Sequence, residues 1–240
     1  DTGGSFRVGT RFGPQAIRDV SVLLRPYNPT LDINVFDILS GVDYGDIDII
    51  PGYINESYDM IQKSLEPVFA SPAIPILMGG DHSITLPELR AVKNIKGPVA
   101  IAHFDSHSDT WKSYFNQPYN HGTPFRRAIE EGCILTEHSI QVGMRGPLYG
   151  PGDLKDAEAL GLEVLTTWKM RELGLKEVAS KIRERVGDKP VFISFDIDFL
   201  DPAYAPGTGT PEIGGFTTWE TIKLIHDSLS GLNIIGFDLV

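Results

Sequence analysis

Cysteine is almost absent from this sequence, which has one, Cys133, among 240 residues. A single thiol cannot form a disulfide within the chain, which fits a reducing compartment. We expect Cys133 to pack at a helix end rather than to act as a nucleophile. The chain also lacks an apolar run of the ~20 residues that a membrane span needs, and residues 1–5 contain neither an initiator methionine nor a signal sequence.

Basic residues are in deficit. The 21 lysines and arginines face 32 aspartates and glutamates, which gives a net charge of −11 at pH 7. Phosphates of nucleic acids and anionic membrane surfaces repel such a chain, so we expect neither as a partner. With 41% hydrophobic residues the chain can bury a substantial core. No repeat or linker divides it, and we therefore expect residues 1–240 to form one domain.

The most informative stretch is an apolar segment, 98–104, that ends abruptly in Asp105, His107 and Asp109. In an extended chain alternate side chains point the same way, so this spacing predicts three polar groups on one face. Neighbouring carboxylates repel each other unless a cation lies between them, and carboxylate and imidazole groups together are ligands of first-row metals. The alternative is a polar loop whose aspartates cap the next helix.

Two further apolar segments end in similar groups. Residues 74–78 lead to His82, and residues 191–195 lead to Asp196 and Asp198. The carboxyl ends of parallel strands share one edge, where sites form in α/β proteins. The converging side chains are His82, Asp105, His107, Asp109, Asp196 and Asp198. One divalent ion does not need four carboxylates and two imidazoles, whereas two ions with bridging carboxylates do. We therefore predict a two-metal hydrolytic centre.

Strand and helix patterns alternate through most of the chain. The expected strands are 74–78, 99–104, 139–144, 163–165, 191–195 and 234–239. The expected helices are 15–25, 54–69, 85–95, 123–131, 153–160, 176–186 and 217–229. Between 26 and 53 we expect only short β-like pieces, at 33–36 and 42–44. The alternation predicts an α/β fold whose parallel sheet is covered by helices on both faces.

Four motifs carry a resemblance to a known family. They are Gly-Gly-Asp-His-Ser at 79–83, Asp-x-His-x-Asp at 105–109, His-Gly-Thr-Pro-Phe at 121–125 and Ser-Phe-Asp-Ile-Asp-Phe-Leu-Asp-Pro at 194–202. Their order resembles the ureohydrolases, which include arginase, agmatinase, guanidinobutyrase and guanidinopropionase. The resemblance implies an arginase-like fold, a three-layer αβα sandwich with a mostly parallel sheet. It also implies hydrolysis of a guanidino compound to urea and an amine.

The resemblance further implies two Mn²⁺ ions as cofactors, with Ni²⁺ or Co²⁺ as alternatives. The implied ligand roles are one ion on His82 and Asp109, the other on His107 and Asp198, and both bridged by Asp105 and Asp196. It also implies a homo-oligomer, trimer or hexamer, and a place in polyamine metabolism. We expect a cytoplasmic protein, and a mitochondrial form stays open because the natural N-terminus is absent from these residues.

The chemistry of such a centre follows from the substrate. Three nitrogens donate electrons into a guanidinium carbon, so water does not attack it at neutral pH. Two divalent ions lower the pKa of a water molecule enough to supply hydroxide. The leaving amine then needs a proton. His121 resembles the family's proton-shuttle histidine, and histidine as a residue type is suited to that task; the alternative is a loop histidine that only packs. We expect His103 to lie on the strand face opposite the ligands and Asp201 to shape a turn.

The identity of the guanidino compound is open. Arginases place Asn where this chain has Trp111, and acidic residues where Gly146, Pro147 and Leu148 follow Arg145. We therefore expect arginine to be a far poorer substrate than a guanidine that lacks its amino or carboxyl group.

The run from Asn120 to Ala128 resembles the agmatinase and guanidino-acid branch, and we expect Asn120, Trp111 and Arg145 to contact the substrate. Agmatine would need a carboxylate or an open polar pocket for its ammonium. A guanidino acid would need an arginine, for which Arg7, Arg11 and Arg145 are candidates.

Two other functions stay open. A relative that has lost catalysis would bind metal as a scaffold or regulator, whereas this chain keeps all six ligands and His121. A formiminoglutamase-like hydrolase would share the metal set and release formamide. We also expect residues 1–240 to be a fragment that is truncated at both ends, poorly soluble or nearly inactive. In similar family members the last strand continues into a glutamate that receives the guanidinium, an interaction worth ~2 kcal/mol or more.

Overall fold

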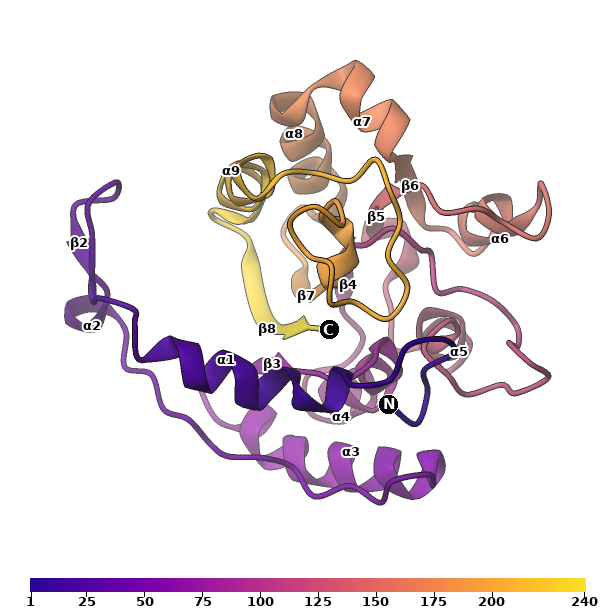
Figure 1. The fold of residues 1–240 in the computed structure, drawn as a ribbon, viewed down its shortest axis with the longest axis horizontal. Helices are drawn as coiled ribbons and strands as arrows, with labels where there is room; N and C mark the ends of the chain where they lie inside the picture. The colour runs from indigo at the N-terminus through magenta and orange to yellow at the C-terminus, as the bar shows by residue number, and fades with distance from the viewer.

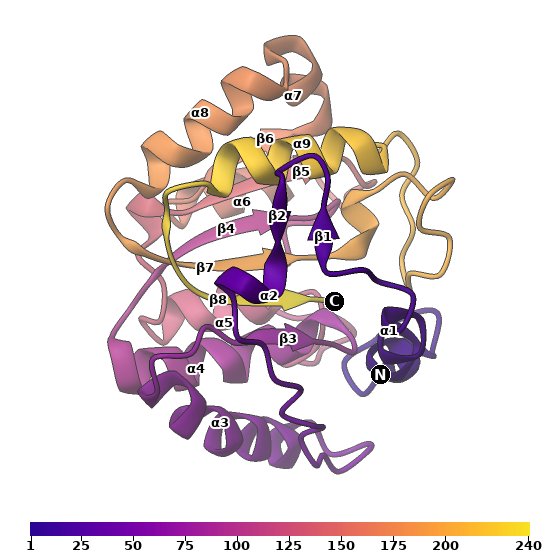
Figure 2. The same cartoon turned by 90° about the vertical axis from the view of Figure 1, so that its left-hand side faces the viewer.

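The centre of the fold is a parallel sheet. The computed structural model describes all 240 residues. In spatial order the six strands are β3 (Ile76–Met78), β8 (Asn233–Leu239), β7 (Pro190–Phe195), β4 (Ala100–Phe104), β5 (Ile140–Met144) and β6 (Glu163–Thr166). Every neighbouring pair is parallel, and the arrows of β3, β8, β7 and β4 point the same way in Figure 2. The carboxyl ends of the strands therefore share one edge.

Helices cover both faces of the sheet and produce three layers (Figure 1). One layer contains α3 (Ile54–Ala70), α4 (Thr85–Lys96) and α5 (Pro124–Glu130). The opposite layer contains α7 (Thr167–Leu173), α8 (Leu175–Val186) and α9 (Thr218–Leu229). The short helix α6 (Asp153–Ala159) packs beside β6. The predicted α/β sandwich with a parallel sheet is confirmed.

The burial of both faces explains why the central strands are apolar throughout instead of alternating with polar residues. All five residues of β4 are buried. Ala102 and Phe104 belong to the core cluster beneath α8 and α9, whereas Val99 and Ile101 belong to the cluster beneath α3 and α4. Cys133 is buried in the second cluster, at the end of α5, so its predicted packing role is confirmed.

Most predicted elements are present within two residues of their expected limits, but α7 was not expected. It spans seven residues, and the Thr166 side chain caps it by accepting a hydrogen bond from the Lys169 N–H. Helix α9 begins with a capping box between Thr217 and Glu220. By length and hydropathy, no helix qualifies as a membrane span.

Two predictions in the first fifty residues are wrong. The piece at 33–36 is a two-residue strand, β2 (Ile33–Asn34), paired with β1 (Tyr27–Asn28), and then a helical turn, α2 (Val35–Ile38). The Asn34 side chain caps that turn by accepting from the Phe36 N–H, which ends the strand. Residues 42–44 form no regular element. The helix expected at 15–25 is α1 (Gly13–Ser21), after a 3₁₀ turn η1 (Thr10–Phe12), and none of its residues is buried.

A pair of carboxyl groups is buried between α4 and β8. Glu88 and Asp238 are 2% and 0% exposed. The Thr85 hydroxyl donates to Asp238 Oδ2 at 2.7 Å, and the Phe195 N–H donates to Asp238 Oδ1 at 3.2 Å. Burial and then the charge of Asp238 raise the pKa of Glu88 well above its ordinary value. Glu88 is therefore protonated more readily in the folded chain than in the unfolded chain.

This raised pKa predicts a pH-dependent effect of Glu88→Gln. The folded state holds the Glu88 proton more tightly than the unfolded state does. The stability that this proton contributes is therefore fully present below the pKa of Glu88 in the unfolded chain, and it is lost as pH rises through the pKa of Glu88 in the folded chain. Glutamine imitates the neutral acid at every pH. The gain in melting temperature from Glu88→Gln should therefore be larger at pH 8.5 than at pH 5. The exposed Glu184→Gln is the control, and an equal gain at both pH values for Glu88→Gln would contradict the assignment.

Candidate metal centre and adjoining pocket

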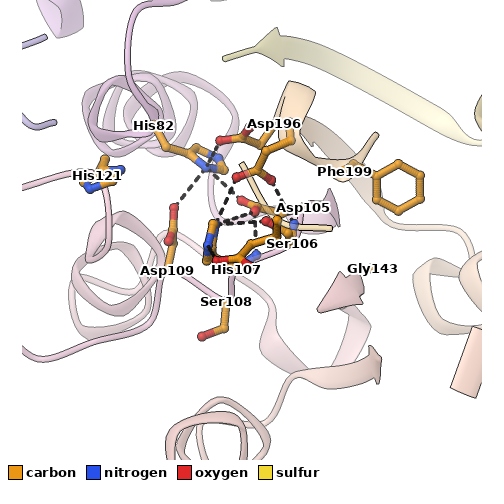
Figure 3. Close-up of polar contacts among 12 residues, drawn as sticks. His82, Asp105, Ser106, His107, Ser108, Asp109, His121, Gly143, Asp196 and Phe199 are labelled. Carbon is orange, nitrogen blue, oxygen red and sulfur yellow. Dashed lines mark hydrogen bonds and ion pairs between the residues drawn. The ribbon is translucent and has the colours of Figure 1, made fainter. Parts of the chain in front are cut away.

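The predicted ligands meet at the carboxyl edge of the sheet (Figure 3). His82 opens the turn η2 (His82–Ile84) after β3, and Asp196 caps the turn η4 (Ile197–Phe199) after β7. The loop after β4 contributes the three residues of the Asp-x-His-x-Asp motif, between these two turns. Contacts of 3.5 Å or less link all six predicted side chains into one cluster.

One half of the cluster surrounds His82. Its Nδ1 atom lies 3.0 Å from Asp105 Oδ2, 3.0 Å from Asp109 Oδ2 and 3.5 Å from Asp196 Oδ2. Its Nε2 atom lies 2.9 Å from the Ser194 hydroxyl, which fixes the orientation of the ring from the side opposite Nδ1. This side of the imidazole therefore faces three carboxylates.

The other half surrounds His107. Its Nδ1 atom lies 3.0 Å from Asp198 Oδ2 and 3.5 Å from Asp105 Oδ1. Asp105 therefore presents one oxygen toward His82 and the other toward His107, and it is fully buried. A carboxylate in this position is suited to bridge two ions.

The arrangement fits cations because it lacks enough positive charge of its own. His82 Nδ1 and Asp198 Oδ2 are buried and make no hydrogen bond, although leaving such groups unpaired is costly. Burial and then repulsion from Asp198 and Asp105 raise the pKa of Asp196 well above its ordinary value. Burial opposes protonation of His107, yet Asp105 and Asp198 outweigh it and raise the pKa of the imidazole to about 12. Positive charge is therefore favoured at this cluster, and two divalent ions would supply it.

The motif converges through a turn and not, as predicted, through strand alternation. The strand β4 ends at Phe104, before the first ligand. Asp105 Oδ1 then accepts from the His107 N–H at 2.6 Å, which curls the loop. Asp109 has φ +49°, a left-handed conformation uncommon outside glycine. Asp196 makes the equivalent turn, in which its Oδ1 accepts from the Asp198 N–H at 2.8 Å.

The prediction that His103 lies on the face opposite the ligands is wrong. Residues two apart on an extended chain share a face, and His103 Nε2 lies 2.8 Å from Asp105 Oδ2. The Gln141 Nε2 amide donates to the Ser108 carbonyl at 2.6 Å and lies 2.9 Å from His103 Nδ1. Because that nitrogen is a donor, His103 Nδ1 accepts, and its Nε2–H donates to Asp105. Both ring nitrogens of His103 are thus occupied in support of Asp105, as expected of a core histidine.

A cavity of about 340 Å³ opens beside the cluster. His107, Asp109 and Asp196 line its inner end. Three aromatic residues of its wall face one another: Trp111 lies 4.9 Å from Tyr114 and 5.4 Å from Tyr149 between ring centroids. The Trp111 indole also rests against Gly122, where a Cβ atom would approach to 3.0 Å. Trp111 therefore lies in the cavity wall, where the sequence placed a substrate contact.

The loop that carries Trp111 is held by a tight turn. Tyr114 and Gln117 exchange backbone hydrogen bonds around Phe115 and Asn116, which have φ of 50° and 60°. The Asn120 Nδ2 amide donates to the Gln117 carbonyl at 2.9 Å, and Asn120 Oδ1 accepts from the Gly122 N–H at 2.9 Å. Asn120 is not part of the cavity lining, and its side chain supports the loop.

His121 lines the same cavity, apart from the ligand cluster in Figure 3. Its Nε2 atom lies 2.7 Å from the Ser5 hydroxyl, and the backbone N–H of His121 donates to the Gly3 carbonyl at 3.0 Å. The Gly3 N–H in turn donates to Asp81 Oδ2 at 3.1 Å, beside His82. The N-terminal segment thus completes the surroundings of His121. Sequence reasoning missed Ser5 because its contact spans 116 positions.

Arg145 lines the cavity, but its guanidinium is turned into the protein. Its three nitrogens donate to the backbone carbonyls of residues 143, 198–200, 212 and 213. Asp201 accepts from the N–H groups of Ala203, Gly214 and Gly215, so its predicted turn role is confirmed. Both residues hold the loop after β7 in place.

Glu212 is a second residue that the sequence did not reveal. It lines the cavity, and its Oε1 atom lies 3.7 Å from His107 Nε2, the ring nitrogen that faces away from Asp198. Gly146 makes room for this pair, because a Cβ atom there would lie 3.2 Å from the His107 ring and 3.3 Å from the Glu212 carboxyl group. Glu212 stands in a stretch of glycine, threonine and proline that has no period, so no pattern marked it.

Comparison with known proteins places this site in a family. The model of the Arginase family matches residues 1–240. The chain is 43% identical over 240 residues to the mitochondrial agmatinase of Gallus gallus, of which it covers 70%. It is 41% identical to the guanidinobutyrase of Pseudomonas aeruginosa, of which it covers 75%. Each alignment covers the whole of this chain.

Solved structures of related proteins support the same family. Proclavaminate amidino hydrolase from Streptomyces clavuligerus superposes with a TM-score of 0.94 at 42% identity, over 100% of this chain and 79% of that one. Formimidoylglutamase from Bacillus subtilis superposes with a TM-score of 0.87 at 31% identity, over 95% of this chain and 72% of that one. The fold, the clustered ligands and the match along the whole sequence lead to one conclusion: this chain belongs to the arginase family.

Proposed function

We propose that this protein is a binuclear-metal hydrolase that cleaves a guanidino compound to urea and an amine. The observation that carries the proposal is the pair of imidazoles, each within 3.5 Å of Asp105, at the inner end of a cavity large enough for a small linear substrate. Relatives at about 40% identity are an agmatinase and a guanidinobutyrase. Both names describe hydrolysis of a guanidino group, which supports the same chemistry here.

Two ions, Mn²⁺ by family resemblance, would be held by these side chains: His82 and Asp109 for one, His107 and Asp198 for the other, and Asp105 and Asp196 for both. The contacts of Asp105 with both imidazoles support its shared role, whereas the shared role of Asp196 rests on the family resemblance. When bound, the ions would act as Lewis acids and lower the pKa of the attacking water. Gln141 and His103 would keep Asp105 oriented, as outer groups do in metal sites.

Residues of the chain would bind the substrate and transfer the proton. The guanidinium group of the substrate would lie at the inner end of the cavity, beside the ion-binding carboxylates. The leaving amine requires a proton after attack, and His121 lines the cavity with Nε2 held by Ser5. We assign His121 as the proton shuttle, because a histidine can accept and return a proton near neutral pH.

The two alternative functions have less support. A formiminoglutamase-like activity would place this chain with a protein that it matches at 31% identity, below the guanidino hydrolases. A scaffold without catalysis would not need the complete ligand set that the structure brings together. A homo-oligomer is also part of the proposal. It is supported by the exposed apolar side chains of the N-terminal region, among them Val20, Leu23 and Leu24.

The proposed function is tested by urea release with Mn²⁺, and Asp105→Asn supplies the decisive variant. Asparagine keeps the shape of Asp105 and loses the charge shared between the two halves of the cluster. We expect no detectable turnover and a bound-metal content well below two ions per chain, measured by elemental analysis. Asp37→Asn, on the exposed turn α2, should retain both. Full activity of Asp105→Asn, or of the parent with one ion per chain, would refute the binuclear assignment.

Gln141→Leu tests the support of Asp105. Leucine fills similar volume but cannot bind His103 Nδ1, so the ring is free to turn and Asp105 loses a fixed donor. Loss of an outer group of this kind typically weakens metal binding 10–100-fold, and we expect a change in that range in a competition titration against a chelator. Gln62→Leu serves as the control, because Gln62 is a half-buried glutamine of α3 whose amide donates to Glu66, away from the cluster. Unchanged metal affinity in Gln141→Leu would show that His103 needs no such support.

His121→Ala separates proton transfer from metal binding. If His121 returns the proton, kcat should fall on the order of 10²-fold or more while two ions stay bound. The exposed His226→Ala should change neither quantity. Loss of metal from His121→Ala would instead identify His121 as a ligand and disprove the assignment.

A further inference from the structure

The outer end of the cavity is lined by aromatic rings rather than by charged groups. The centroids of Trp111, Tyr114 and Tyr149 lie 4.9, 5.4 and 6.4 Å apart, so each ring is near both others. No arginine or lysine of the chain lies over these three rings, in contrast to Tyr58, Tyr119 and Phe216 elsewhere. Aromatic faces attract cationic groups, and these three adjacent rings have no cation of their own.

The charges of the cavity favour the same ligand. Two divalent ions would carry four positive charges, which equals the charge of the four ligand aspartates. Glu212 then adds one negative charge to the lining, and Arg145 adds one positive charge. The Arg145 guanidinium donates to backbone carbonyls, whereas the Glu212 carboxyl group lies 3.7 Å from His107 Nε2. A positively charged group that approaches Glu212 is therefore attracted, and a carboxylate is repelled.

A carboxylate would also find no free cation there. Arg145 is the single arginine or lysine of the lining, and its nitrogens already donate to backbone carbonyls. Arg7 lines a smaller adjoining cavity of about 30 Å³, which shares several lining residues with the first, and its guanidinium donates to the Pro206 carbonyl. Arg11 is paired with Asp1 at 2.5 Å. Neither Arg7 nor Arg11 lines the main cavity.

We propose that Trp111, Tyr114 and Tyr149 form a subsite for a protonated amine at the distal end of the substrate. This inference rests on the proposed guanidino hydrolase function and selects one of its two substrate classes, a guanidinoalkylamine such as agmatine rather than a guanidino acid. The inner end of the cavity takes the guanidinium, and the alkyl chain spans the distance to the rings. The tight turn at Phe115 and Asn116 fixes Tyr114 within this group.

Three ligands test the subsite. Agmatine carries an ammonium, pentylguanidine replaces it by a methyl group of similar size, and 4-guanidinobutyrate carries a carboxylate. Binding to the Mn²⁺-loaded protein is measured by calorimetry, on ice to limit turnover, at ligand concentrations from low to saturating. Agmatine should bind about tenfold or more tighter than pentylguanidine. We expect 4-guanidinobutyrate to bind most weakly. Tighter binding of 4-guanidinobutyrate than of agmatine would overturn the proposal.

Trp111→Leu is the informative variant, because leucine keeps an apolar wall but removes the ring. The preference for agmatine over pentylguanidine should fall to near one, whereas Trp111→Phe should keep most of it. Trp168→Leu, an exposed tryptophan on α7, is the matched control and should leave the preference unchanged. Arg7→Met should not weaken the binding of 4-guanidinobutyrate any further. An unchanged preference in Trp111→Leu would refute the subsite.

Urea release from the same three ligands separates the two proposals. If urea forms but agmatine has no binding advantage over pentylguanidine, the subsite is wrong and the hydrolase function stands. If no ligand yields urea and agmatine still binds with the Trp111-dependent advantage, the subsite stands and the hydrolase function is wrong.

Discussion

Repulsion among the carboxylates at one buried edge of the sheet is the constraint on which the rest of this structure depends. Asp105 and Asp198 are 0% and 1% exposed, and removing such charges from water is costly unless an opposite charge compensates them. The pKa values of Asp196 and of the His82 and His107 imidazoles are raised, so protons compete with ions for these groups. Ions must displace these protons, so metal affinity should increase with pH.

The topology explains why this edge can collect the ligands. From β4 the chain adds β5 and β6 on one side, and then returns to place β7 on the other side of β4. The loops after β4 and β7 therefore diverge, and a crevice opens between them at the switch point. Asp105 and Asp196 stand at the first position after each strand, while His82 reaches the crevice from beyond β8. The parallel strands thus determine where each of these residues lies, and the turns that follow the strands determine the direction of each side chain.

This division also marks what could be predicted from sequence. Strand-like runs ending in Asp or His predicted the sheet, its layers and the converging ligands, because burial and period are local signals. The aim of each side chain depends on turns such as that at Asp109, which the spacing alone does not show. Ser5, Gln141 and Glu212 could not be found, because each acts through a contact with a residue far away in the sequence. The amide of Asn120 matched a family motif, yet it serves the loop.

The two ends of the cavity are subject to different requirements. The inner end must hold two ions and a guanidinium whatever the rest of the substrate is, so its residue types follow from the reaction. The outer end can change without loss of the chemistry. That difference explains why whole-chain identity, 43% to an agmatinase and 41% to a guanidinobutyrase, does not distinguish an amine from an acid. Specificity must instead be read from the few side chains at the outer end. There the Arg145 guanidinium donates to the loop that shapes the cavity, and Trp111, Tyr114 and Tyr149 provide aromatic rings, which favour a cation.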